Sequence, residues 1–543
     1  MLRMWTYDLA REQSPTTEHL DRLCRLTQEA GYDALGLYLE HRFAYASAPW
    51  AAGRGALTPE TVAWLRREHP SLRLIPFANV LGHMEGFLYA SGGERLAEER
   101  FKGMQAAPWN PEVAAFARGL LDDVMRAFDD EIVHLGGDET QQLAASAKRS
   151  GQAEAELYGG YFGPMAAHVA ERGRRPGVWG DMFPEHPTAL DALPKETLVF
   201  DWQYFGSPRD TARRFIDAGH EVVLSPTIHV YDAAWCHLPQ TERNVRDHAE
   251  AAAELGAYGV CVTTWEGALF ASYETLLPAI AGCGELLRAE GGGVRVETGG
   301  ATPTVPVEEG GPEPGSGIET DPPSALTSLP YADLHEAPTL LRAYLKAGER
   351  HEEWARLMGF ELNEAGGPFA FTGIRSALKA RLLLYGNPFL LWLRSREDLL
   401  GEPGDKALAI LERAIAFAPD SAYRGVSEFA KIAIQIVRFI EESATAYRTG
   451  KPGVAAAALA PIRLAFDDLA RIAKGTNLRI GGSLADVERC AVAKEHVERV
   501  MRRIKGYGDG SLGYLPSYET ICHPKFMPHD QANWWLINDW ANE

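Results

Sequence analysis

The stretch Glu131-Ile-Val-His-Leu-Gly-Gly-Asp-Glu-Thr140 runs from an apolar segment into two glycines and then into two adjacent carboxylic acids. The apolar segment predicts a short buried strand. Neighbouring side chains of a strand point to opposite faces, so Asp138 and Glu139 can serve one pocket only if the backbone turns there. Because glycine permits such a turn, the stretch predicts a strand that ends in an acidic turn.

The same order of elements recurs through the N-terminal half of the chain: a short β-branched or aromatic run, a polar residue, and an amphipathic stretch of helical length. Eight runs fit it, over residues 3–8, 33–40, 72–80, 131–137, 177–181, 197–204, 221–227 and 258–266. Strands that alternate with helices need crossover connections and form parallel sheets. Eight units, with no G-x-G-x-x-G after Asp8, favour an α/β fold of the (β/α)8 TIM-barrel type over a doubly wound open sheet.

Polar residues accumulate at the C-terminal ends of these runs, which in a barrel form one rim, where active sites are built. They are Asp8, Glu40, His83, Asp138, Glu139, Asp181, Tyr204, Asp232 and Glu266. Strand ends also meet water, so a place on the rim does not by itself assign a function to a residue.

The rest of the chain changes in composition. Residues 289–332 are rich in glycine and proline, as is typical of linkers, and a helical pattern follows, with Phe429, Ala433 and Val437 on one face. We therefore predict a catalytic barrel over residues 1–288, a linker over 289–332, a mostly α-helical domain over 333–505 and a tryptophan-containing tail over 506–543.

Composition excludes some classes of partner. With 54 Lys and Arg against 74 Asp and Glu, the formal charge is −20, which disfavours nucleic acid. No apolar run reaches the roughly 18 residues of a membrane span. The start of the chain shows no secretory signal, and the six cysteines have no paired spacing, so we expect a soluble cytoplasmic protein. The adjacent pairs Cys236-His237 and Cys522-His523 lack zinc-type spacing, and no metal or other cofactor is expected.

Asp138 and Glu139 suit acid–base chemistry, because one of two neighbouring carboxylates can stay ionised while the other holds its proton. An alternative is structural: Asp138 caps the next helix and Glu139 lies in its first turn. Spacing alone does not decide between these interpretations.

The string from His134 to Glu139 resembles the H-x-G-G-D-E signature of family 20 glycoside hydrolases, the β-N-acetylhexosaminidases, and lies at the fourth strand, as in that family. The resemblance implies a retaining, substrate-assisted mechanism in which the acetamido oxygen of the sugar attacks the anomeric carbon. It makes Glu139 the general acid and base, and Asp138 the residue that orients the acetamido group.

Other strand ends carry weaker resemblances. Asp8-Leu-Ala-Arg11 resembles the family's D-x-x-R, whose arginine binds sugar hydroxyls. Leu81-Gly-His83 resembles its P-G-H, with leucine in place of proline. The resemblance implies that His83 and His134 support the two acids without touching the sugar.

Aromatic residues and further acids complete the predicted sugar site. Trp179, Trp202 and Trp265 suit the walls of an acetamido pocket, because the C–H faces of a pyranose pack on aromatic rings. Tyr231-Asp232 resembles the family's Y-x-D without its spacer, and Tyr204 competes with Tyr231 for the phenol role. Glu266 directly follows Trp265, where family members commonly show W-x-E.

The sequence thus predicts an exo-acting β-N-acetylhexosaminidase that removes terminal, non-reducing β-linked GlcNAc, or GalNAc, from small oligosaccharides or glycoconjugates. The prototypical members place a small domain before the barrel, whereas this chain begins almost at strand one. We therefore expect a divergent subgroup, whose helical domain is a candidate surface for a homodimer. Two alternatives stay open: a barrel glycosidase with a protein nucleophile, Glu266 or Asp181, and a non-catalytic sugar-binding barrel.

Overall fold

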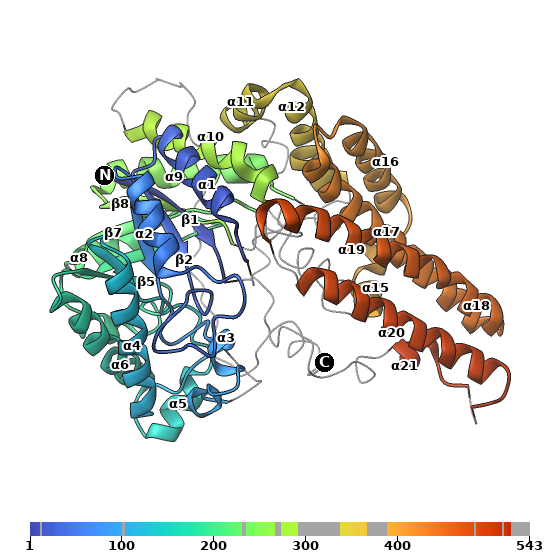
Figure 1. The fold of residues 1–543 in the computed structure, drawn as a ribbon, viewed down its shortest axis with the longest axis horizontal. Helices are drawn as coiled ribbons and strands as arrows, with labels where there is room; N and C mark the ends of the chain where they lie inside the picture. The colour runs from blue at the N-terminus through green and yellow to red at the C-terminus, as the bar shows by residue number, and fades with distance from the viewer. Residues whose placement is uncertain are drawn as a thin grey trace, which may run out of the picture.

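The computed structural model describes residues 1–10, 13–99, 104–230, 235–265, 273–291, 337–365, 388–482, 485–512 and 515–522. Eight parallel strands close a barrel in sequence order, with β8 paired to β1 (Figure 1). They are β1 (Leu2–Asp8), β2 (Ala34–Tyr38), β3 (Arg73–Phe77), β4 (Ile132–His134), β5 (Arg175–Trp179), β6 (Leu198–Trp202), β7 (Val222–Ser225) and β8 (Gly259–Val262). Each lies wholly or mostly within one of the predicted runs, so the predicted (β/α)8 barrel is confirmed.

Helices follow the strands and surround the barrel. They are α1 (Thr17–Glu29), α2 (Pro59–Glu68), α3 (Glu85–Leu88), the 3-10 turn η1 (Glu94–Leu96), α4 (Pro111–Ala127), α5 (Leu143–Ser150), α6 (Glu154–Ala170), α7 (Pro187–Leu190), α8 (Arg209–Asp217), α9 (Leu238–Leu255) and α10 (Tyr273–Gly291). Side-chain caps fix several starts: the side chains of Thr16, Thr58 and Asn110 each accept a backbone N–H of the helix that follows.

The strands are shorter than most of the predicted runs. The predicted run 131–137, for example, contains only the three residues of β4. Gly136 and Gly137 follow with φ of 76° and 107°, outside the β region, so the chain leaves the sheet before the two acids.

The barrel interior is a packed core. Met4, Ile75, Phe77, Phe200 and Val223 are fully buried in it. A separate, larger core lies between the strands and the surrounding helices. The interior is therefore filled, and the chemistry of the barrel belongs at its rims.

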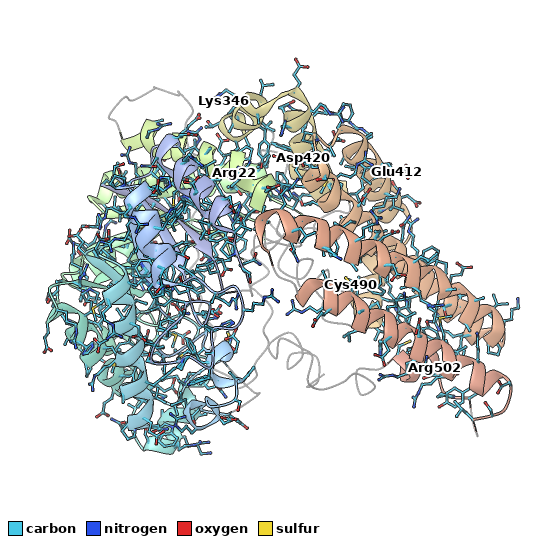
Figure 2. All side chains as sticks on the ribbon, viewed as in Figure 1. Arg22, Lys346, Glu412, Asp420, Cys490 and Arg502 are labelled. Atoms are coloured by element: carbon cyan, nitrogen blue, oxygen red, sulfur yellow. The ribbon has the colours of Figure 1, made fainter. Side chains whose placement is uncertain are left out.

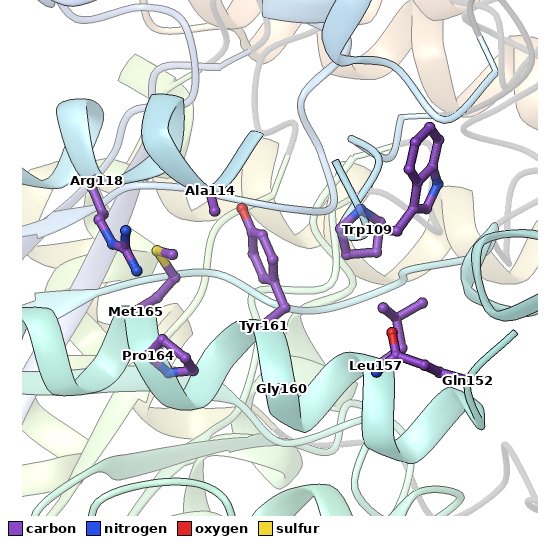
Figure 3. Close-up of a pocket in the computed structure, with 10 residues that line it drawn as sticks. Trp109, Ala114, Arg118, Gln152, Leu157, Gly160, Tyr161, Pro164 and Met165 are labelled. Atoms are coloured by element: carbon purple, nitrogen blue, oxygen red, sulfur yellow. The ribbon is translucent and has the colours of Figure 1, made fainter. Parts of the chain in front are cut away.

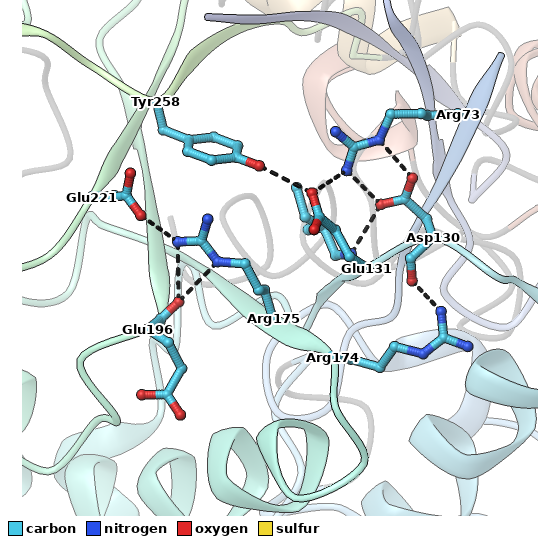
Figure 4. A network of polar contacts seen from close by, with 9 residues as sticks. Arg73, Asp130, Glu131, Arg174, Arg175, Glu196, Glu221 and Tyr258 are labelled. Carbon is cyan, nitrogen blue, oxygen red and sulfur yellow. Dashed lines mark hydrogen bonds and ion pairs between the residues drawn. The ribbon is translucent and has the colours of Figure 1, made fainter. Parts of the chain in front are cut away.

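Ion pairs close the N-terminal end of the barrel (Figure 4). Arg73 donates two hydrogen bonds to Asp130, at 2.7 and 2.8 Å, and a third to Glu131. Arg175 pairs with Glu221 at 2.6 Å and lies over the ring of Tyr258. This network joins the starts of neighbouring strands and is placed to stabilise the barrel at the end opposite the two acids.

A helical lobe follows the barrel, running from yellow to red in Figure 1. Its helices are α11 (Pro338–Ala347), α12 (Glu349–Arg356), the π-helical turn η4 (Leu357–Glu361), α13 (Leu362–Ala365), α15 (Pro388–Leu399), α16 (Glu402–Phe417), α17 (Ser421–Arg448), α18 (Pro452–Ala458), α19 (Ala460–Ile480), α20 (Ala485–Gly508) and α21 (Tyr518–Cys522). The predicted helical C-terminal region is confirmed. The linker and most of the tail lie outside the described residues, so the domain boundaries remain predictions.

The lobe packs against the barrel through apolar and charged contacts. Trp235, just before α9, packs edge-on against Trp354 of α12, with ring centroids 4.7 Å apart. Glu274 of α10 pairs with both Arg22 of α1 and Arg479 of α19. Arg22 lies on the side of the barrel that faces the lobe (Figure 2). Barrel and lobe therefore share one continuous core.

Among the helices that the structure describes, none has the length and apolar character needed to cross a lipid bilayer.

Candidate active site

The turn after β4 places both acids on one side. Nε2 of His83 lies 3.4 Å from Oδ2 of Asp138 and 3.2 Å from Oε2 of Glu139. The turn is fixed at Gly137, where a Cβ atom would stand 2.7 Å from the hydroxyl of Tyr158, and that hydroxyl donates to the Gly137 carbonyl at 2.6 Å. Asp138 and Glu139 therefore both lie against the imidazole of His83.

The capping alternative is not what the structure shows. The next helix, α5, begins at Leu143, with Gln142 at its cap position and no side-chain capping bond. Asp138 thus lies too early in the chain to cap α5, and both acids stay available to the rim.

The two carboxylates differ in exposure. The side chain of Glu139 is 46% exposed, whereas that of Asp138 is 12% exposed. Oδ1 of Asp138 is buried without a hydrogen-bond partner. The site therefore combines Glu139, whose carboxylate reaches solvent, with Asp138, whose carboxylate is mostly buried and has one acceptor oxygen without a hydrogen-bond partner.

His83 is held between the two acids by a close approach of two loops. A Cβ atom at Gly82 would stand 2.4 Å from the carbonyl oxygen of Asp138, so only glycine fits there. Burial by itself lowers the pKa of His83, but the charges and hydrogen bonds of Asp138 and Glu139 outweigh it and raise that pKa well above the ordinary value. The two acids thus favour the protonated form of His83.

Asp181, just after β5, holds Glu139 from the neighbouring strand. Its Oδ2 accepts the backbone N–H of Glu139 at 3.0 Å. Burial, and then the charge of Asp138, raise the pKa of Asp181 well above its ordinary value. Sequence reasoning placed Asp181 on the rim and considered it as a rival nucleophile, without this contact to the Glu139 backbone.

Backbone strain is concentrated at this rim. In the described chain the non-glycine residues with positive φ are Glu40, His83 and Glu139, which follow β2, β3 and β4. Such conformations cost on the order of 1–3 kcal/mol each and cluster at functional sites.

The predicted aromatic residues meet above the barrel core. Trp179 is fully buried, 5.8 Å from Trp265 between ring centroids, and its indole N–H has no partner. Trp265 donates its indole N–H to the hydroxyl of Tyr204, whose ring lies 5.0 Å from Trp202. Burial raises the pKa of Tyr204, and the charges of Asp138 and Glu139 raise it further, so this phenol lies in the field of the acids.

His134 acts from inside the barrel. Its ring stacks on Phe77 at 4.3 Å, and its Nδ1 accepts the backbone N–H of Gly136 at 3.0 Å. Burial lowers its pKa well below the ordinary value, so the ring is neutral. By accepting the Gly136 N–H, His134 holds the backbone of the turn that carries Asp138.

Four predicted substrate residues, Arg11, Tyr231, Asp232 and Glu266, lie outside the described residues, and their roles remain predictions. In the described part of the chain, one group of three side chains has the types and spacing of metal ligands: Glu40, His83 and Glu85. Glu85 was not among the predicted site residues; its only signal is its place two positions after His83.

A cavity of about 260 Å³ lies elsewhere, between α4 and α6, lined by Trp109, Arg118, Tyr161 and neighbours (Figure 3). None of the predicted site residues lines it, so it is distinct from the rim site.

A closed barrel with paired carboxylates after β4 is an arrangement that suits a barrel enzyme of the glycosidase type. Residues 90–271 match the family model described as glycosyl hydrolase family 20, catalytic domain. This part of the barrel is therefore similar to the catalytic domain of that family. No curated protein sequence matches the chain significantly.

Solved structures similar to the chain include the beta-N-acetylhexosaminidase from Bacteroides fragilis, with 15% identity over 52% of this chain and 65% of that one, TM-score 0.44. The exo beta-N-acetylglucosaminidase from Vibrio harveyi has 17% identity over 52% of this chain and 53% of that one, TM-score 0.42. A chitobiase from Flavobacterium johnsoniae has 13% identity over 92% of this chain and 78% of that one, TM-score 0.46. The chain thus spans less than two thirds of the length of the first two.

Proposed function

We propose that the protein is an exo-acting β-N-acetylhexosaminidase that releases terminal, non-reducing β-linked GlcNAc or GalNAc. The observation that carries this proposal is the convergence of Asp138 and Glu139 on His83 at the end of β4, inside a region that matches the family 20 model. Their H-x-G-G-D-E string resembles the signature of that family.

The geometry suits a substrate-assisted, retaining reaction. Glu139 reaches solvent and acts as the general acid that protonates the leaving glycosidic oxygen, and then as the base that activates water. Asp138 offers the buried Oδ1 to the acetamido N–H and stabilises the positive charge that develops as the acetamido oxygen attacks the anomeric carbon.

The aromatic cluster supports an acetamido pocket. Trp265, with the buried Trp179 packed against it, offers an apolar face for the acetamido methyl group. The Tyr204 hydroxyl, which lies in the field of the two acids, is the candidate to bind the acetamido carbonyl. Trp202 lies beside Tyr204 as a further wall.

The substrate that we propose is a small oligosaccharide or glycoconjugate. We place the protein in the cytoplasm, in keeping with six cysteines that are all buried and form no disulfide. The helical lobe exposes Leu464 and Leu478, side chains 68% and 74% accessible, which supports it as the surface of a homodimer.

The test is hydrolysis of chromogenic β-GlcNAc, β-GalNAc and β-glucoside by the wild type, Asp138→Asn and Glu139→Gln. We expect cleavage of an N-acetylated substrate and none of the glucoside, with a fall in rate of about 10²- to 10⁴-fold in Glu139→Gln. Glu29→Gln, an exposed carboxylate on α1, is the matched control and keeps full activity.

The same assay separates the alternatives. Cleavage of the glucoside alone favours a protein nucleophile, which does not need the acetamido group. Hydrolysis that is equal in the wild type and Glu139→Gln indicates a barrel that only binds sugar. Asp181 is a poor nucleophile candidate, because its Oδ2 already accepts the Glu139 backbone N–H.

A further inference from the structure

Behind the two acids lies a second group of ligand-type side chains. Glu40 follows β2, His83 follows β3, and Glu85 begins α3. One ligand atom from each of these residues lies within 4.8 Å of the other two. Two segments, the loop after β2 and the stretch from His83 to Glu85, therefore converge on one small volume.

Two of the three side chains in this group are buried, and Glu85 is partly exposed. Glu40 is 3% exposed and His83 is 7% exposed. Nδ1 of His83 and Oε2 of Glu85 are both buried without a hydrogen-bond partner. Leaving such atoms unpaired costs free energy, which a ligand that engages them recovers.

The local charge favours a cation. Nε2 of His83 already faces Asp138 and Glu139, and the Glu40 and Glu85 carboxylates stand near the same ring. Carboxylates attract cations and repel anions, and a metal bound at Nδ1 of His83 takes the place of the proton on that nitrogen.

The donor set identifies the class of cation. Carboxylate oxygens suit Mn²⁺ and one imidazole nitrogen suits Zn²⁺ and its neighbours in the first transition row. A histidine that binds a metal through one nitrogen characteristically donates its other N–H to a carboxylate. His83 has that arrangement, with Nε2 on Asp138 and Glu139 and with Nδ1 unpaired.

We propose that Glu40, His83 and Glu85 form a binding site for one divalent transition-metal cation of the Mn²⁺ and Zn²⁺ type. The site does not depend on which sugar the enzyme cleaves. Its ligand His83 also touches the two proposed catalytic carboxylates, so a bound cation is joined to them through a single imidazole ring.

The test uses the full chain, stripped with a chelator and titrated with Mn²⁺ while the electron paramagnetic resonance signal of free Mn²⁺ is recorded. We expect saturable binding of one ion per chain, displaced by Zn²⁺. Glu85→Gln weakens binding by at least about tenfold. The exposed control Glu29→Gln binds as the wild type does.

Glu40→Gln gives an independent second variant, and the circular dichroism spectrum and melting temperature of each variant establish that it is folded. The absence of saturable Mn²⁺ binding by the wild type overturns the proposal. Equal binding by the wild type and a folded Glu85→Gln or Glu40→Gln also overturns it. Because the readout is metal binding, it is independent of whether the chromogenic sugars are cleaved.

Discussion

The backbone N–H of Glu139 donates a 3.0 Å hydrogen bond to Oδ2 of Asp181, so the loop after β5 holds the turn after β4. Glu139 has φ of 46°, a left-handed conformation that L-residues rarely adopt, and the bond helps to hold it there. The Asp181 side chain therefore acts on the position of the proposed general acid.

Replacing Asp181 separates this positioning bond from the charge. Asp181→Asn keeps an oxygen that can accept the Glu139 N–H, whereas Asp181→Ala removes it. We expect kcat to fall by roughly tenfold in Asp181→Ala, because a misplaced acid loses rate without losing binding, and KM to stay near the wild-type value. Steady-state kinetics on the best chromogenic substrate measure both constants.

Asp181→Asn serves as the conservative control and should keep more of kcat than Asp181→Ala does. It should also resist unfolding better than the wild type at neutral pH, because the raised pKa means that ionised Asp181 is disfavoured in the folded state. The stability that Asp181 contributes is fully present below its pKa in the unfolded state, and it is lost as pH rises through its pKa in the folded state. Wild-type kcat in Asp181→Ala would contradict the positioning role.

The titration of His83 reports on the two acids directly. Its pKa lies well above the ordinary value because Asp138 and Glu139 outweigh the effect of burial. Asp138→Asn removes the larger of the two charge contributions, and we expect the pKa to fall by one unit or more. Imidazole NMR resonances followed against pH measure the shift, and His134, which is neutral and buried, is the internal control.

The same shift has a consequence for stability. Since the folded pKa of His83 is above its unfolded value, its contribution is fully present below about pH 6.5 and is lost as pH rises through the folded pKa. His83→Gln should therefore lower the free energy of unfolding most at acidic pH. If the loss of unfolding free energy in His83→Gln instead grows with rising pH, that result would contradict the raised pKa of His83.

The sequence predicted the barrel because its signals are local. Eight strand and helix units can be counted along the chain, and the glycines after His134 predicted the turn that carries Asp138 and Glu139. Strand ends were less predictable, since Gly136 and Gly137 leave the β region before the predicted run ends.

Contacts between different strand ends were not predictable in the same way. The bond from Glu139 to Asp181 and the approach of Glu85 to Glu40 join residues more than 40 positions apart. They depend on how neighbouring loops fold over the rim, where a close approach such as that of Gly82 to Asp138 decides the distance. The contact between Trp354 and Trp235 was also not predictable, because aromatic residues in both halves of the chain can pack together in many different ways.

Tyr204 offers a test of the acetamido pocket. Its hydroxyl accepts the indole N–H of Trp265, and Tyr204→Phe removes that hydroxyl without changing the size of the ring much. We expect kcat/KM for the N-acetylated substrate to fall roughly tenfold, the effect of about one hydrogen bond. An unchanged kcat/KM would leave the phenol role to Tyr231.

The ion pairs at the N-terminal end of the barrel should matter for stability and not for catalysis. Arg73→Ala leaves Asp130, whose side chain is only 5% exposed, without the partner of its two hydrogen bonds. Removing one member of a buried pair costs roughly 3 kcal/mol, so the free energy of unfolding in urea should fall by about that amount. Arg213→Ala breaks a solvent-exposed pair with Glu254 and is expected to cost about 1 kcal/mol or less. Because the two acids lie at the opposite rim, kcat of both variants should match the wild type below their unfolding transitions. A loss of kcat in folded Arg73→Ala would contradict this expectation and would mean that the two ends of the barrel are coupled.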